Sequence, residues 1–125
     1  MRMVCSCLAL LVITASFAPA QNESATAVVC KEIVKNSCEG ADTTFPNGVG
    51  KLYGFSQVLD VPDKIVHVWY YKDRELGRFA MTAPNAPRWR TWSNVTVAKN
   101  MLGPWKLEVR DSKGKVLATF PFKIE

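Results

Sequence analysis

The sequence has a single histidine, His67, among its 125 residues. Chemistry that requires two or more imidazoles, as many zinc sites do, is therefore excluded. No residue beside His67 in the sequence is an evident nucleophile or metal ligand. Ser93 follows a tryptophan and lacks the flanking glycines of a nucleophile elbow. We therefore expect no enzyme activity, no cofactor and no metal site.

Charge of one sign is not concentrated anywhere along the chain. The 16 lysines and arginines exceed the 11 aspartates and glutamates only modestly, and they are spread over the sequence. Such an excess favours anionic surfaces without specifying one, and we expect no nucleic acid as partner. With 48% hydrophobic residues the chain has a globular composition, and its length suits one domain.

No apolar run approaches the roughly 20 residues that a membrane span requires. A shorter run at residues 8–17 follows Arg2 and precedes the small residues at 18–20, an arrangement typical of a secretory signal peptide. We therefore expect an exported protein, periplasmic or secreted, whose mature chain does not span a membrane. The expected organisation is a signal peptide at 1–20, a flexible N-terminus at 21–26 and a single domain at 27–125.

Two of the four cysteines, Cys30 and Cys38, belong to the expected mature chain. Exported proteins retain disulfides, and closing a loop of this size would stabilise the fold by about 2–3 kcal/mol. If residues 28–36 form a helix, the two Cα atoms lie about 12 Å apart along its axis, too far for a bridge. If the chain runs as a strand and turns at Asn36 and Ser37, the cysteines can meet. The apolar positions do not choose between helix and strand, but the even count in an exported chain favours the disulfide.

The rest of the chain predicts strands. Residues 105–110 alternate between apolar and charged side chains, which is the period of a strand with one dry face. A turn at 111–114 leads into a last strand at 116–124. Pro121 in that strand cannot donate to a sheet, which predicts an edge or a bulge there. One face of the last strand is expected to hold Val116, Ala118, Phe120, Phe122 and Ile124.

Further strands are expected at 65–71, 76–81 and 88–98, and an earlier one is indicated by Tyr53, Phe55 and Leu59, which share a parity. No segment of the mature chain reads as a convincing amphipathic helix. About seven short strands with regularly spaced turn signals predict an all-β fold, an antiparallel immunoglobulin-like β-sandwich. A small barrel is the alternative.

Four motifs follow one another along the chain: KLYGFS at 51–56, IVHVWY at 65–70, RWRTWS at 88–93 and GPWKLEV at 103–109. With them the chain resembles the bacterial domain-of-unknown-function family 2914, from residue 29 to its C-terminus. The resemblance implies a bacterial β-sandwich module that faces the periplasm or the exterior. It implies no activity.

The motif at 88–93 is the first candidate for binding. In an extended strand Trp89 faces one way, while Arg88, Arg90 and Trp92 face the other. If Trp89 fills the core, the second face presents two guanidinium groups beside an indole, which suits an anionic sugar, a peptidoglycan carboxylate or an acidic partner. If Trp92 fills the core instead, Arg90 must be paired inside it. Base rates favour a structural role for both tryptophans.

The second candidate is a stripe of one parity in the strand at 65–71, formed by Ile65, His67, Trp69 and Tyr71. An exposed aromatic stripe could hold a sugar ring, but both parities of this strand are apolar, which favours a buried strand with the stripe in the core. Together with Arg88, Arg90 and Trp92, the residues His67, Trp69 and Tyr71 make up the candidate ligand site.

These features leave two functions open. The first is a protein-interaction or structural module of the cell envelope, in which an edge strand or a flat face docks another envelope protein. The alternative is a module that binds cell-wall glycan through the aromatic and arginine face. The glycan function requires at least two exposed rings on one face among Trp69, Tyr71, Trp89 and Trp92.

Overall fold

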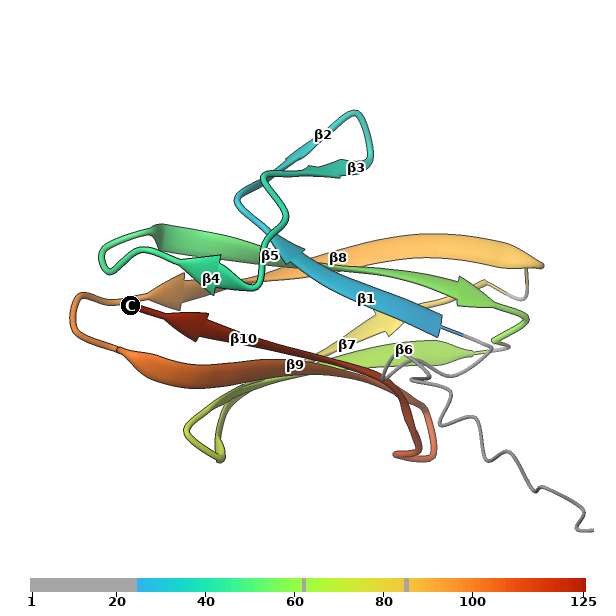
Figure 1. Ribbon diagram of the computed structural model, residues 1–125. Helices are drawn as coiled ribbons and strands as arrows, with labels where there is room; N and C mark the ends of the chain where they lie inside the picture. Colours follow the sequence, from blue (N-terminus) through green and yellow to red (C-terminus); the bar gives the residue numbers. More distant parts are fainter. Residues whose placement is uncertain (1–24, 62, 85) are drawn as a thin grey trace, which may run out of the picture.

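Two β-sheets face each other in the computed structural model, which describes residues 25–61, 63–84 and 86–125 (Figure 1). One sheet has three strands in the order β1-β5-β8, and the other has five in the order β4-β10-β9-β6-β7. All neighbours pair antiparallel except β4 and β10. A separate hairpin of β2 and β3 stands off the outer side of the three-stranded sheet. The predicted signal peptide at 1–20 lies outside the described residues.

The predicted all-β sandwich is confirmed, and the described residues form ten strands in place of about seven. The three additional strands, β2, β3 and β4, are only two or three residues long, too short to show a hydrophobic period. The strands are β1 Ala25–Cys30, β2 Glu32–Val34, β3 Ser37–Glu39, β4 Thr44–Phe45, β5 Gly50–Leu59, β6 Lys64–Tyr71, β7 Arg74–Thr82, β8 Arg88–Val97, β9 Gly103–Asp111 and β10 Val116–Ile124. Within the described parts of the chain no helix is long and apolar enough to cross a membrane.

The core lies between the sheets and is built around aromatic rings. Trp69 on β6 meets Phe122 on β10 edge-on, and Trp105 on β9 stacks on the same phenyl ring. Opposite them, β5 turns Gly54 and Ser56 inward, because the ring of Trp69 already fills the space beside Gly54. The aromatic side chains of β5, Tyr53 and Phe55, belong to the parity that faces outward, while Leu52 and Val58 are buried on the inward parity.

The last strand departs from its predicted face at one residue. A register shift between Val116 and Ala118 turns Val116 outward and buries Leu117 in its place. The bulge thus lies at the start of β10 and not at Pro121. Pro121 lies on an edge, because β4 covers β10 only at its end, where it pairs with Lys123 and Ile124.

The predicted disulfide between Cys30 and Cys38 is present, with the two Cα atoms 5.7 Å apart. Between the cysteines the chain forms strands, which decides the alternative that the sequence left open. The turn of the hairpin lies at Lys35 and Asn36, one residue earlier than expected. Both have positive φ, 49° and 61°, as the tight hairpin turn that matches strand twist requires.

Candidate functional site

The edge strand β8 carries the predicted arginine and tryptophan motif, and its side chains alternate as expected. Arg88, Arg90 and Trp92 point away from the core, and Trp89 lies on the inward parity. Both indoles are 38% exposed, so neither tryptophan fills the core. Trp89 stays exposed because β8 is the last strand of its sheet and has a neighbour on one side only.

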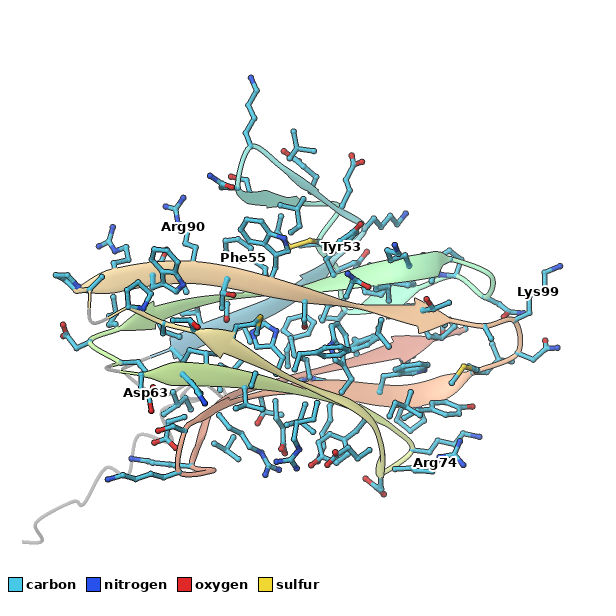
Figure 2. The ribbon with its side chains drawn as sticks, turned by 180° about the vertical axis from the view of Figure 1, so that it is seen from behind. Tyr53, Phe55, Asp63, Arg74, Arg90 and Lys99 are labelled. Atoms are coloured by element: carbon cyan, nitrogen blue, oxygen red, sulfur yellow. A yellow bond between two sulfur atoms is a disulfide. The ribbon has the colours of Figure 1, made fainter. Side chains whose placement is uncertain are left out.

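The indole of Trp92 packs against a side chain of the neighbouring strand β5. Phe55 on β5 lies opposite Trp92 in the register, and the two rings stack with centroids 6.2 Å apart and planes within 8°. Figure 2 shows Phe55 and Tyr53 beneath the hairpin and Arg90 to one side of it, all three on the outer side of the three-stranded sheet. Sequence reasoning missed Phe55 as a site residue, although its shared parity with Tyr53 was the available signal.

Neither arginine of this face forms an ion pair within the residues that the structure describes. Arg90 donates through Nε to the Gln57 side-chain oxygen at 3.3 Å, which leaves its charge uncompensated. By contrast, Arg78 and Arg110 on the other sheet are paired with Glu75 and Glu108. The outer face around Trp92 therefore presents two cationic groups that can bind an anion.

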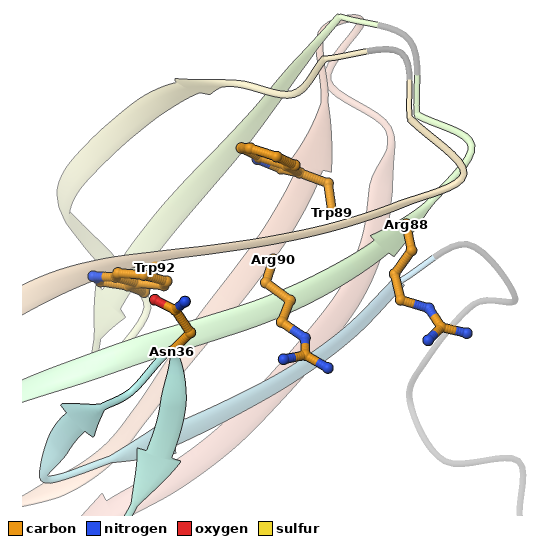
Figure 3. Close-up of a pocket in the computed structure, with 5 residues that line it drawn as sticks. All are labelled: Asn36, Arg88, Trp89, Arg90 and Trp92. Carbon is orange, nitrogen blue, oxygen red and sulfur yellow. The ribbon is translucent and has the colours of Figure 1, made fainter.

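These side chains border an open hollow of about 400 Å³, lined by Asn36, Arg88, Trp89, Arg90 and Trp92 (Figure 3). Asn36 comes from the tip of the hairpin that the disulfide ties to β1. Because Trp89 and Trp92 belong to opposite faces of β8, the hollow reaches around the free edge of this strand. The site thus combines two indole rings, two cations, an amide and an exposed backbone edge.

His67 and Trp69 lie in the core, away from this hollow. The two ring nitrogens of His67 lie 2.8 Å from Ser56 Oγ and 2.7 Å from Ser93 Oγ. Trp69 donates through Nε1 to the same Ser93 oxygen. Burial lowers the pKa of His67 to about 3, so the imidazole is neutral at ordinary pH.

A model of the family described as Protein of unknown function (DUF2914) matches residues 62–124. The chain belongs to the DUF2914 family. No curated protein matches it. The DUF2914 match contains three of the four motifs, those at 65–70, 88–93 and 103–109, and the motif at 51–56 precedes it. Within the hollow, the β8 residues fall inside the DUF2914 match, whereas Asn36 lies outside it.

The six predicted ligand residues of this DUF2914 chain separate into two groups. Arg88, Arg90 and Trp92 share the hollow. His67, Trp69 and Tyr71 form the inward parity of β6, where Tyr71 packs on Trp105 and donates its hydroxyl to the Leu102 carbonyl at 2.8 Å. The structure therefore does not bring the stripe and the arginines together, and the exposed rings Trp89 and Trp92 lie on opposite faces of β8.

No cluster of three histidine, cysteine or acidic side chains suited to a metal ion occurs in the described segments of this DUF2914 chain. The two cysteines of the described chain are joined to each other, so neither is available as a thiolate. The groups around β8 are suited to bind an anionic ligand, since the arginines can pair with its charge and the indoles can stack on it.

Proposed function

We propose that this DUF2914 protein is a non-catalytic exported module that docks an acidic partner protein of the cell envelope in the hollow beside β8. The observation that carries the proposal is the pair of arginines, Arg88 and Arg90, without carboxylate partners beside the Trp92 and Phe55 stack. Guanidinium groups bind carboxylates through paired hydrogen bonds, and an adjacent aromatic ring adds apolar contact area.

Two observations support the non-catalytic and exported character. The one imidazole of the chain is fully buried between two serines and has its pKa lowered to about 3, so it is poorly suited to exchange protons with a substrate at neutral pH. The Cys30–Cys38 disulfide is compatible with an oxidising compartment, and the signal-like segment at 1–20 points the same way.

A cell-wall glycan is the second candidate ligand: the exposed indole of Trp92 beside Arg90 favours it, and the position of Trp89 on the opposite face of β8 counts against it. Acidic sugars and peptidoglycan stem peptides offer carboxylates to the arginines, and a sugar ring can pack on an aromatic ring. One face of Trp92 is already taken by Phe55, however, which reduces the area left for a sugar.

Calorimetric titration with two defined probes tests the proposal. The probes are the acidic peptide acetyl-Glu-Val-Glu-Val-Glu-Val-Glu-amide and a purified muropeptide. We expect the acidic peptide to bind, with an affinity that falls as salt rises, and the double substitution R88A/R90A to weaken it by about tenfold or more.

The matched control is K113A/K115A, which removes two exposed cations from the turn between β9 and β10. This variant should leave the affinity for the acidic peptide within about twofold of the unmodified protein, since it lies outside the hollow. An equal loss in the control variant, or no binding of the acidic peptide, would overturn the proposal. Binding of the muropeptide alone would favour the glycan.

A further inference from the structure

The structure assigns a mode to this docking: we infer that an extended acidic segment of the partner pairs with the free edge of β8 as an additional strand. This inference rests on the proposed function, because it takes the hollow to be the docking site. Peptides that add a strand to a sheet gain affinity from backbone hydrogen bonds and selectivity from alternate side chains.

β8 is unusually unprotected for an edge strand of this sandwich. It is ten residues long, contains no proline or glycine, and pairs with β5 without a register shift from Gly50–Val97 to Leu59–Arg88. Long regular edges are normally interrupted or covered, because they recruit other strands. An edge left open in this way is therefore suited to a partner.

The other sheet edges in the described chain are protected. β4 has two residues, and β10 carries a bulge and Pro121 where β4 does not cover it. β7 contains Gly77 and an ion pair between Glu75 and Arg78, and its pairing with β6 is shifted between Trp69 and Tyr70. β1 has only six residues, against ten in β8. Among the sheet edges of the described chain, β8 is therefore the one best suited to pair with an added strand.

The backbone groups that a new strand needs are presented by the residues of the hollow. Beyond the last register pair, Asp60 N donates to Pro87 O, so this pair is hydrogen-bonded. Hydrogen-bonded and non-hydrogen-bonded pairs alternate along an antiparallel ladder. The N–H and C=O groups of Arg88, Arg90 and Trp92 therefore point away from β5, toward the free edge.

Side chains on both faces of β8 offer contacts to such a strand. On the outer face an added strand would place alternate side chains beside Arg88, Arg90 and Trp92. On the inner face its other side chains would meet Trp89 and approach Phe79 of β7, two apolar groups that are 38% and 42% exposed although they lie on inward parities. The contacts on the two faces call for acidic and apolar residues in alternation.

Charge distinguishes this partner from a second copy of the chain. β8 contains two arginines and no acidic residue, so pairing between two copies of β8 would gather four guanidinium groups along one ladder. Like charges on adjacent strands are destabilising. An acidic segment instead compensates both arginines.

N-methylated peptides test the inference without altering the protein. The probe acetyl-Glu-Val-Glu-Val-Glu-Val-Glu-amide is compared with two versions, one N-methylated at its glutamates and the other at its valines. In an added strand, only one of these sets of N–H groups faces β8. We expect one version to lose about tenfold or more in affinity and the other to stay within about threefold of the parent.

The outcomes separate the inference from the proposed function. If both methylated versions bind like the parent peptide, strand addition is wrong while docking at the arginines stands. If the parent does not bind and the muropeptide does, the protein partner itself is wrong. A dimer of the free protein in sedimentation that R88A/R90A strengthens would also overturn the inference, because removal of the like charges would then favour pairing of β8 with its own copy.

Discussion

His67 Nδ1 lies 2.7 Å from Ser93 Oγ, and this contact joins the two sheets in the middle of the core. His67 belongs to β6 of the five-stranded sheet, and Ser93 belongs to β8 of the three-stranded sheet. The other ring nitrogen reaches Ser56 on β5. Because buried polar groups must find partners, this network fixes how the sheets face each other and holds β8 in place.

The titration of His67 makes stability depend on pH. Burial lowers its pKa to about 3, while the unfolded chain binds the proton near the ordinary value of 6.5. The unfolded state therefore holds more protons between these values, and the free energy of unfolding decreases as the pH falls below 6.5. Between pH 6 and 5 we expect a loss of about 1 kcal/mol from this group in urea unfolding.

His67→Gln is the control for this prediction. The variant cannot titrate in this range, so its stability should change little between pH 6 and 5 apart from the contribution of carboxylates. It should also be less stable than the parent at pH 7 by about 1–3 kcal/mol, because the contacts to Ser56 and Ser93 are disturbed. An equal pH slope in both proteins would contradict the assignment.

Gly54 is required by the closeness of the opposite sheet. A Cβ atom at this position would lie 2.6 Å from Leu107 Cδ2 and 2.7 Å from Trp69 Cζ2. Both side chains are fully buried and have no room to move. We expect Gly54→Ala to lower the free energy of unfolding by about 1–3 kcal/mol, as overpacking does. Thermal and urea unfolding measure this loss.

Gly77→Ala is the matched substitution on a strand edge. The added methyl group would lie 3.2 Å from the ring of Phe79, which is 42% exposed and can shift. Its stability should stay within about 0.5 kcal/mol of the parent. A comparable loss in both variants would show that Gly54 is sensitive for a reason other than its contact with Trp69.

The sequence was sufficient to predict the β-sandwich and the dry face of β9, but not which face of β5 points into the core. Period-two alternation predicted the dry face of β9, and the even cysteine count in a chain expected to be exported predicted the bridge between Cys30 and Cys38. The structure bears out both the dry face and the bridge. The inward parity of β5 could not be predicted in this way. The inward face holds Gly54 and Ser56 between Leu52 and Val58, whereas the opposite parity holds the larger rings of Tyr53 and Phe55, and only the position of Trp69 in the other sheet explains why the smaller residues face inward.

The candidate site was predicted in part for a similar reason. The alternation of Arg88, Arg90 and Trp92 follows from an extended backbone, and the structure places all three on one face. Whether an indole in that strand is buried depends on where the strand lies in its sheet, which local sequence does not encode. Phe55 and Asn36 join the site only through pairing and a hairpin, more than thirty residues away in the chain.

The disulfide places the hairpin tip at the hollow. The central residues of β2 and β3, Ile33 and Cys38, are only half-buried, so the hairpin has little core of its own. Replacing both cysteines, C30A/C38A, should lower the free energy of unfolding by about 2–3 kcal/mol through loss of the cross-link. The far-ultraviolet circular dichroism should remain that of a β-protein, because the strands of both sheets lie outside the bridged loop.

The same variant should also weaken binding of the acidic peptide, since the freed hairpin no longer holds Asn36 beside Trp92. Asn36→Gly separates the two contributions, because glycine tolerates the positive φ of 61° and removes only the amide. If the tethered position of the hairpin matters, C30A/C38A weakens binding more than Asn36→Gly does. If the amide alone matters, both variants lose the same affinity. Unchanged affinity in both would exclude the hairpin from the site and leave β8 and Phe55 to form it.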